Sequence, residues 1–397
     1  MFTSSLWITG SSRTGKTSLL TQEFCQWVRQ QLSGQQKKSR QILPQQQLTP
    51  AVLVFAANNS NRRKLADRLS LAVDGTYPVI CKTPVGFITD EVTLFWPLLF
   101  ERLKLKAQFP LRLRPEAEQE LATKLWRDRP EWDILVANTN EYRLVRQTLD
   151  LLQLAGTSGI PTEDIPTILE QGLPNLELDE AGKQENRLNE GLWQKMGQLL
   201  LDWRNWCLDR GLLTYGLIYE LYWRYLLPDP TYQSHLIPRY QAIFADDVDD
   251  YPAIARDLFE LLLDRGKFAV FTYNPDGKIR LGLNADPNYL EGLAVRCQIR
   301  ELPSLNTGLI SELDSTIAQL GNETWFPSFL PDSIQSIQTI SRAELLRTTA
   351  DIIIKAVKRG EIQPSEIALI APGLDEIARY SLIEMLSAQG IAVEPLN

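Results

Sequence analysis

Residues 10–17 constrain the fold of this chain more than any other segment, because they read Gly-Ser-Ser-Arg-Thr-Gly-Lys-Thr. This is the phosphate-binding loop pattern G-x-x-x-x-G-K-[ST], in which glycines let backbone N–H groups curl around phosphate oxygens. Residues 6–9 before it form a short apolar run typical of a strand, and residues 18–24 after it begin a helical pattern. A strand, a glycine-rich turn and a helix N-terminus in that order favour anion binding. The segment therefore predicts a site for ATP.

The pattern gives each residue of the segment an expected role. Lys16 is expected to reach the β- and γ-phosphates as a catalytic residue, and the Thr17 hydroxyl to hold Mg²⁺. A glycine-rich turn that precedes an ordinary helix is the alternative interpretation. The expected ATP-binding residues are Gly10, Ser11, Ser12, Arg13, Thr14, Gly15, Lys16 and Thr17.

Composition limits the class of protein. A chain of 397 residues has room for two or three domains, and 44% apolar with 23% charged residues is typical of a globular protein with real cores. The net charge of −8 excludes a general basic field for nucleic acid, so any such surface must be a local patch. No apolar run is long enough for a membrane span, and no signal-peptide pattern opens the chain. We expect no membrane partner and a cytoplasmic location.

Cysteine and histidine usage argues against several kinds of site. The cysteines lie far apart and form no C-x-x-C pair, which disfavours zinc and fits a reducing compartment. His235 is the single histidine, so neither a histidine metal centre nor a Ser-His or Cys-His nucleophile is expected. The four cysteines are Cys25, Cys81, Cys207 and Cys297.

Apolar patterning predicts an α/β fold, a P-loop NTPase (RecA-like) parallel sheet split by a helical insertion. We assign the first RecA-like domain to residues 1–100 and 239–300, and the helical insertion to 101–238. Residues 301–340 are expected to form a connector, and 341–397 the start of a second RecA-like domain that continues beyond Asn397. Strands are predicted at 6–9, 51–55, 78–81, 242–245, 268–272 and 367–370. Helices are predicted from about 62 to 71, 116 to 126, 142 to 154, 192 to 213, 343 to 359 and 375 to 389, with a solvated loop at 34–50.

Two carboxylates follow a predicted strand far along the chain. Asp246 and Asp247 come directly after the apolar run 242–245. A phosphate-binding loop needs one carboxylate near Mg²⁺ and a second that polarises the attacking water. We assign Asp246 to the metal and Asp247 to catalysis as the base. A solvated acidic turn is the alternative, since residues 246–250 hold four aspartates.

Here the sequence resembles a known family. Residues 246–250, Asp-Asp-Val-Asp-Asp, resemble the D-E-x-Q-D motif of UvrD/Rep-type superfamily-one helicases. Residues 273–287 resemble the family's G-D-P-D-Q-S-I-Y-x-F-R-G-A-D-P segment. They agree with it at Pro275, Asp276, Ile279, Ala285, Asp286 and Pro287.

Weaker similarities extend along the chain. Residues 52–69 and 83–87 resemble family segments that touch single-stranded DNA, and 367–370 with 390–393 resemble the start of the second motor domain. The resemblance implies that Thr83 and Phe87 contact DNA. Asn58 lies at a predicted strand-to-helix corner with polar and basic neighbours and could bind a phosphate backbone, with a polar turn and helix cap as the alternative interpretation.

The departures from the family pattern are equally specific. Asp247 stands in place of the motif-two Glu, Asp249 in place of its Gln, and Gly277 in place of the γ-phosphate-sensing Gln. Leu283 replaces an expected arginine, and residues 306–307 carry none. This pattern is similar to the diverged helicase-like subunits of the AddB and RecB type, in which a nuclease domain can follow the motor.

A basic cluster supplies further DNA candidates. Arg102, Lys104 and Lys106 lie close together, continue to Arg112 and Arg114, and have Phe100 and Phe109 interleaved. Cations that contact phosphates beside aromatic rings that stack on bases are typical of single-strand binding. A solvated charged surface is the alternative interpretation.

The sequence leads to one hypothesis and two alternatives. We expect an ATP-dependent helicase or translocase-like ATPase that acts on single-stranded DNA in repair or recombination, with Mg²⁺ as cofactor and a possible helicase–nuclease partner subunit. The first alternative is a degenerate subunit that binds ATP or DNA structurally without turnover. The second is an unrelated P-loop enzyme such as a small-molecule kinase.

Overall fold

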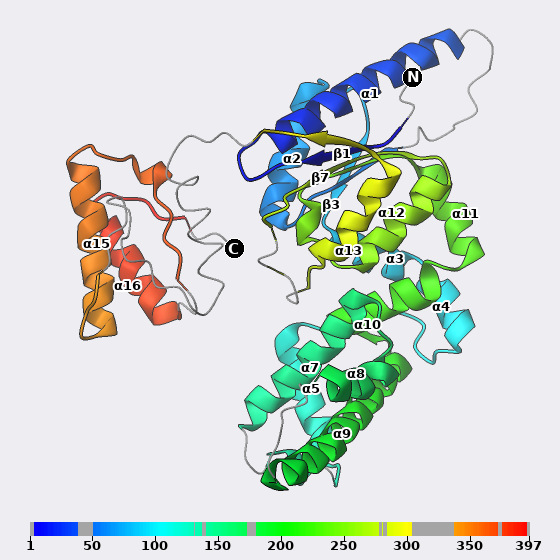
Figure 1. The fold of residues 1–397 in the computed structure, drawn as a ribbon, viewed down its shortest axis with the longest axis vertical. Coiled ribbons are helices and arrows are strands. Elements are labelled where there is room, and N and C mark those ends of the chain that lie inside the picture. Colours follow the sequence, from blue (N-terminus) through cyan, green and yellow to red (C-terminus); the bar gives the residue numbers. More distant parts are fainter. Residues whose placement is uncertain are drawn as a thin grey trace. The chain divides into compact units, whose positions relative to one another are not determined.

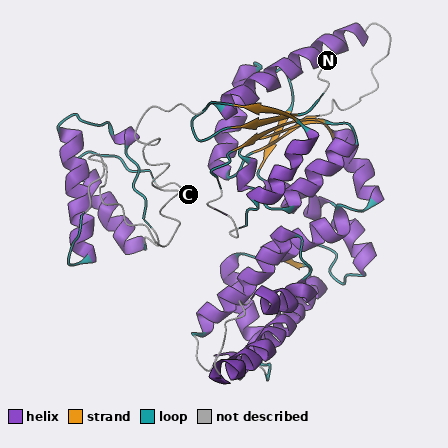
Figure 2. Cartoon of the chain, in the orientation of Figure 1, coloured by secondary structure: helices purple, strands orange, loops and turns teal. Residues whose placement is uncertain are grey.

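The computed structural model describes residues 4–38, 51–130, 132–136, 140–172, 180–277, 280, 284–303, 337–371 and 375–394. The chain divides into two compact units, residues 1–305 and 306–397. The first unit is an α/β structure built on a six-stranded parallel sheet. A helical lobe lies below the sheet in Figure 1, and Figure 2 colours the helices purple and the strands orange. The predicted α/β class with a mostly parallel sheet is confirmed.

The sheet has the strand order β3-β2-β6-β7-β1-β8, and every described neighbouring pair is parallel. Because all strands run the same way, the loops that follow them meet at one edge. Continuous apolar runs form the central strands, as sheets covered on both faces require. The strands are β1 (Leu6–Thr9), β2 (Ala51–Phe55), β3 (Val79–Lys82), β6 (Tyr240–Ala245), β7 (Phe268–Tyr273) and β8 (Gln298–Glu301).

Helices cover both faces of this sheet. The helices α1 (Lys16–Lys38) and α2 (Asn59–Ala72) pack on one face, where Phe24 and Trp27 meet strand residues such as Phe244. The helices α3 (Pro84–Leu94) and α12 (Ile254–Asp264) cover the other face, together with α11 (Pro230–Arg239) and α13 (Pro287–Glu291). The sheet is thereby buried between two apolar layers.

The segment between β3 and β6 forms the helical lobe. Its own core gathers tryptophans, with Trp126 and Trp203 fully buried. It also holds a two-residue parallel pair, β4 (Leu111–Arg112) with β5 (Leu212–Leu213), where the sequence predicted no strand. The remaining elements are α4 (Trp96–Leu103), α5 (Pro115–Arg127), α6 (Trp132–Val136), α7 (Glu141–Ser158), α8 (Ile165–Gly172), α9 (Glu180–Arg210), α10 (Tyr215–Glu220) and the π-helical η2 (Leu221–Leu226).

Several predicted bounds are wrong. The helix α1 continues to Lys38, five residues into the predicted loop, while residues 39–50 lie outside the described part. The helix α9 ends at Arg210, because Gly211 adopts φ +66° and the chain then turns into β5. The strand β8 was not predicted. All four of its residues are exposed at the sheet edge, and they contain no apolar run that would predict a strand.

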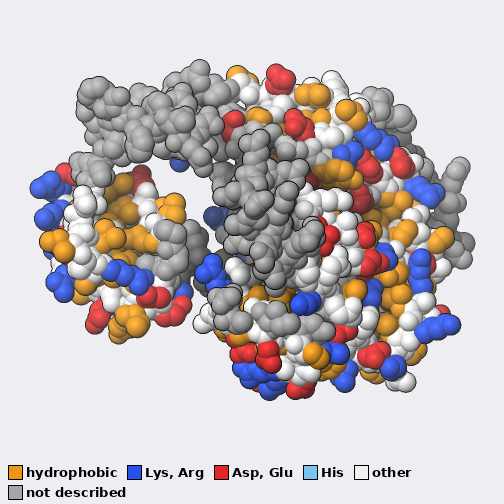
Figure 3. Space-filling view, turned by 60° about the horizontal axis from the view of Figure 1, so that its bottom comes forward, with side chains coloured by type: hydrophobic (Ala, Val, Ile, Leu, Met, Phe, Trp, Pro, Cys, Tyr) orange, Lys and Arg blue, Asp and Glu red, His pale blue; other side chains and the backbone are white. Residues whose placement is uncertain are grey.

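The second unit consists of the helices α15 (Arg342–Lys358) and α16 (Glu376–Ser387) and the short 3-10 turn η6 (Pro364–Glu366). The predicted strand at 367–370 is wrong. The described residues of this unit contain no other strand to pair with it, and Ile370 is 91% exposed. Most of the predicted connector lies outside the described residues. Hydrophobic side chains stand exposed on this unit, as the orange atoms in Figure 3 show, among them Ile340, Ile370 and Ile377.

Acidic and basic side chains are interspersed over the face of the first unit in Figure 3. No described helix has the length and apolar character that would let it cross a membrane.

A buried ion pair closes the helical lobe where the chain leaves and re-enters the sheet. Glu91 lies on α3, just after β3, and Arg239 ends α11, directly before β6. The Arg239 guanidinium donates to both Glu91 carboxylate oxygens, one at 2.9 Å, and the Tyr232 hydroxyl donates to Glu91 Oε2 at 2.8 Å. The Glu91 side chain is only 5% exposed, so its charge depends on these partners.

We predict that Glu91→Ala lowers the free energy of unfolding by about 2 kcal/mol. This is below the usual cost of breaking a buried pair, because the Arg239 side chain is 31% exposed and keeps some hydration. Urea denaturation measures the change. Lys124→Ala is the control, since it breaks an ion pair with Glu120 whose two side chains are 65% and 67% exposed. Equal stability of the two variants would contradict the claim that Glu91 stabilises the junction.

Candidate functional site

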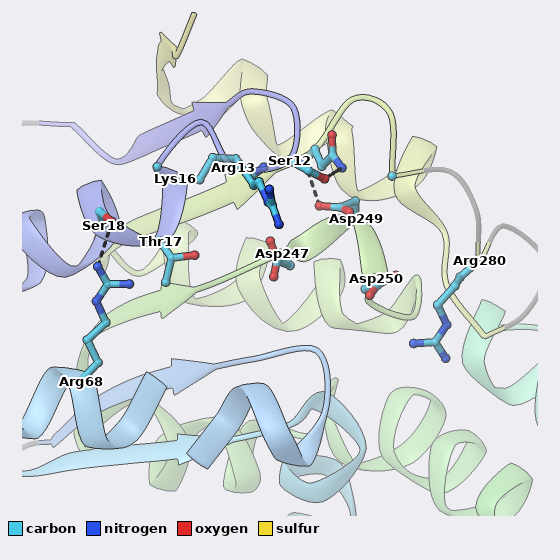
Figure 4. A pocket seen from close by; sticks show the side chains of 13 residues that line it. Ser12, Arg13, Lys16, Thr17, Ser18, Arg68, Asp247, Asp249, Asp250 and Arg280 are labelled. Atoms are coloured by element: carbon cyan, nitrogen blue, oxygen red, sulfur yellow. Dashed lines mark hydrogen bonds between the residues drawn. The ribbon is translucent and has the colours of Figure 1, made fainter. Parts of the chain in front are cut away.

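The loops that follow β1, β6 and β7 surround one cavity at the C-terminal edge of the sheet. Its volume of about 690 Å³ is in the range of small-molecule sites. Figure 4 shows side chains from the three loops, and Arg68 from α2, around this space. The site predicted from residues 10–17 and the acidic segment 246–250 are therefore neighbours, although more than 200 residues separate them.

The loop 10–17 has the backbone that its glycines allow. Gly15 adopts φ +91°, which disfavours any residue with a side chain. At Gly10 an added Cβ would lie 2.6 Å from Thr14 Oγ1, so the chain has no room for a side chain there. Arg13 also has a positive φ of 66°. The Thr14 hydroxyl donates to the Ser11 carbonyl at 3.0 Å and holds the turn.

Lys16 is buried inside this loop. Its Nζ donates to the carbonyl oxygens of Gly10 at 2.8 Å and Ser11 at 2.9 Å, and the residue is only 7% exposed. Lys16 and its neighbour Thr17 are the first residues of α1, and both line the cavity. The backbone N–H groups of the loop, the N-terminus of α1 and the Lys16 ammonium therefore lie together, and all three favour an anionic ligand.

Asp246 connects the three loops. It follows β6 and is only 7% exposed. The Thr17 hydroxyl donates to its carboxylate at 2.9 Å, and the Thr272 hydroxyl on β7 donates to Oδ1 at 2.6 Å. Burial raises the pKa of Asp246, while the hydrogen bonds from Thr272 and Thr17 oppose that rise. The residues that the sequence assigned to the metal, Thr17 and Asp246, are therefore in direct contact.

Asp247 has an unusual backbone. Its φ of 55° and ψ of 55° are left-handed, a conformation that costs a residue with a side chain free energy and is often found at functional sites. Its N–H donates to Thr272 Oγ1 at 2.8 Å, and its side chain lines the cavity. Burial, then the nearby charges of Asp246 and Asp249, raises its pKa to about 7. With this pKa the Asp247 carboxyl group can both take up and release a proton near neutral pH.

The oxygen atoms of Thr17 and Asp246 fit a hard cation. A hydroxyl and a carboxylate beside a phosphate site match Mg²⁺, which keeps several waters and takes few protein ligands. Among the described residues, no group of three or more His, Cys, Asp and Glu side chains is arranged to hold a metal by itself. Thr17 and Asp246 would hold the cation together with ligand phosphates and water.

Several polar residues of the site were not identified from the sequence, among them Thr272, Arg68, Asn274 and Arg280. Thr272 is fully buried on β7. Its hydroxyl within an otherwise mainly apolar strand was the sequence signal that could have identified it. Arg68 on α2 lines the cavity and donates to Ser18 Oγ at 2.8 Å. Asn274 directly follows β7 and also lines the cavity. Its place after a parallel strand, where ligands bind, could have identified it.

Two of the predicted DNA residues lie at the same sheet edge. Asn58 follows β2 and caps α2, and Thr83 follows β3 and caps α3 through a hydrogen bond from the Gly86 N–H at 3.1 Å. Phe87 needs a correction. Its side chain is 2% exposed and packs against Phe55, with ring centroids 5.4 Å apart. It belongs to the core and is not available to a nucleic acid in this conformation.

The basic cluster lies at the end of α4, where the chain enters the helical lobe. Arg102 donates to Asp229 at 3.2 Å, and Lys106 to Asp209 at 2.8 Å, so acids partly neutralise both charges. Lys104 is exposed and ends α4 with φ 53°. The structure does not bring these three cations to the cavity: none of them lines it.

Comparison with known proteins adds no family. No protein-family model matches the chain, and no curated protein matches it. The geometry of the site is therefore the basis for proposing a function.

We predict that Thr272→Val lowers the free energy of unfolding by about 2 kcal/mol. Valine has a similar shape, but it removes the hydrogen bond to the Asp246 carboxylate and the acceptor of the Asp247 N–H. Thr272→Ser keeps the hydroxyl and is the matched control. Urea denaturation measures both variants. If valine and serine are equally stable, Thr272 does not hold the two aspartates in place.

Proposed function

We propose that the chain is a P-loop ATPase with a RecA-like first domain, of the helicase-like type, in which ATP and Mg²⁺ bind between residues 10–17 and Asp246. The observation that supports it most is the hydrogen bond between the Thr17 hydroxyl and the Asp246 carboxylate, 2.9 Å long, beside the buried Lys16. The alternative interpretation of residues 246–250 as a solvated acidic turn does not explain this contact with Thr17, which lies 229 residues away in the sequence.

The expected chemistry follows from the positions of the residues. Backbone N–H groups of the loop and the Lys16 ammonium would bind the phosphates, and Thr17 and Asp246 would hold the cation. Bound Mg²⁺ would neutralise phosphate charge. Asp247, one methylene shorter than the glutamate of related motors, would orient and deprotonate the attacking water. Its left-handed backbone holds the carboxylate in the cavity.

Single-stranded DNA is proposed as the polymer partner. Asn58 and Thr83 lie at the same edge of the sheet as the cavity, so a strand that crosses this edge would meet both loops. The cluster of Arg102, Lys104 and Lys106 would then contact phosphates nearer the helical lobe. A helicase–nuclease partner subunit remains part of the proposal through the resemblance alone.

The second unit is proposed to belong to a second RecA-like domain. The unit leaves apolar side chains exposed, such as Ile370 at 91% and, on α16, Ile377 at 80%. Apolar surface of this kind is suited to packing against other secondary-structure elements.

One observation favours a second candidate function, nucleotide binding without turnover. At Gly277 the family's γ-phosphate-sensing side chain is missing, and an added Cβ there would lie 2.1 Å from Asp249 Oδ2. A site that binds ATP without sensing its terminal phosphate would suit a structural subunit.

We predict that Lys16→Ala abolishes ATP hydrolysis and weakens ATP binding. Loss of one group that stabilises developing charge typically lowers the catalytic rate about a hundredfold or more. Phosphate release and calorimetric titration, each with and without single-stranded DNA, measure the two effects. Lys124→Ala, on the exposed surface of α5, is the matched control.

The outcomes separate the candidates. DNA-stimulated hydrolysis that Lys16→Ala removes supports the motor. Binding that depends on Lys16, without turnover by the wild-type chain, supports the structural subunit. Hydrolysis unaffected by Lys16→Ala would contradict both.

A further inference from the structure

Asn274 presents an amide to the cavity in a fixed orientation. Its Oδ1 accepts a hydrogen bond from the Asp276 N–H at 3.1 Å, and a backbone donor can only bond to the oxygen of the carboxamide. The amide Nδ2 therefore points the other way and lies 3.5 Å from Ser12 Oγ in the loop 10–17. Among the described residues that line the cavity, Asn274 is the one carboxamide.

This amide lies at the end of the loop where a terminal phosphate would bind. Lys16, which reaches the β- and γ-phosphates in such loops, has its ammonium against the carbonyls of Gly10 and Ser11. Ser12 is the next residue. The opposite end of the phosphate chain would lie toward Ser18, farther along α1, and toward Arg68 on α2. Asn274 thus faces the γ-phosphate end.

Asp249 fixes this arrangement and excludes another. Its Oδ1 accepts the Asn274 N–H at 2.9 Å, and its Oδ2 occupies the space in which a side chain at position 277 would begin, 2.1 Å from an added Cβ. The Asn274 carbonyl lies 3.0 Å from the same point. With Asp249 only 5% exposed and hydrogen-bonded, position 277 has no room for a side chain that could reach a phosphate.

Other side chains that line the cavity carry both signs of charge. Asp247, Asp249 and Asp250 are acidic, while Arg13 and Arg280 are cationic donors. The Asn274 amide differs from all of them, because it is a neutral donor held beside Ser12 by its bond from the Asp276 N–H. It is therefore placed to donate to a phosphate at this end of the loop.

We propose that Asn274 is the residue that distinguishes ATP from ADP, by donating a hydrogen bond from Nδ2 to the γ-phosphate. The inference rests on the proposed nucleotide site and deepens it. Asn274 would sense the γ-phosphate in place of a side chain at position 277. No side chain fits at 277, because Asp249 fills that space. The two differences from the helicase pattern, Asp at 249 and Gly at 277, then belong together. The terminal phosphate would be sensed by Asn274, directly after β7.

The test compares the affinities for ADP and for a non-hydrolysable ATP analogue, both with Mg²⁺, by calorimetric titration. Asn274→Asp keeps the oxygen that caps the Asp276 N–H and replaces the donor, and Asn274→Ala removes the donor without adding charge. In both variants we expect analogue affinity to fall about tenfold or more, the effect of one hydrogen bond to a charged group, with ADP affinity within about twofold of wild type. Asn205→Asp is the matched control, because it adds the same charge on an exposed position of α9.

The ADP measurement also reports whether each variant keeps a folded site. Equal losses of affinity for ADP and the analogue would overturn the inference. Wild-type affinity for the analogue in Asn274→Ala would also overturn it, because any loss in Asn274→Asp would then come from charge repulsion alone. Either result leaves the proposed site intact if Lys16→Ala still weakens both nucleotides. A wild-type chain that binds neither nucleotide would overturn the proposed function, and this inference with it.

Discussion

The buried carboxylate of Asp246 is the interaction on which the site depends. An ionised carboxylate inside a protein is costly unless hydrogen bonds compensate it, and here hydroxyls from two other elements do so. Thr17 comes from the start of α1 and Thr272 from β7, so the bonds form only if β1, β7 and β6 keep their register. The same hydroxyl of Thr272 also accepts the Asp247 N–H. One threonine therefore positions both aspartates.

The helical lobe explains how residues so distant in sequence meet. The chain leaves the sheet after β3, builds a lobe with its own aromatic core, and returns at β6, next to β2 in the sheet. The pair of Glu91 and Arg239 ties the two ends of this excursion together beneath the sheet. Because that junction is fixed, a long insertion can be accommodated without displacing the carboxylates at the end of β6.

Much of the first unit could be predicted from sequence because its signals are local. Continuous apolar runs mark β2, β6 and β7, and the glycine pattern marks the loop at 10–17. The failures share a different cause. Phe87 was assigned to DNA by resemblance, but its burial depends on Phe55 and the helical lobe, which no local pattern records. The strand at 367–370 required neighbours that the described second unit lacks. Thr272 and Asn274 have roles only in three dimensions, since each acts on a residue from another loop.

The most direct test of the account is a crystal structure of the chain with Mn²⁺ and a non-hydrolysable ATP analogue, with the metal located by its anomalous scattering. The account predicts one manganese peak within bonding distance of Thr17 Oγ1, near the Asp246 carboxylate, with the β- and γ-phosphates inside the loop formed by residues 10–17. Nucleotide bound elsewhere, or phosphates in this loop with the metal away from Thr17 and Asp246, would contradict it.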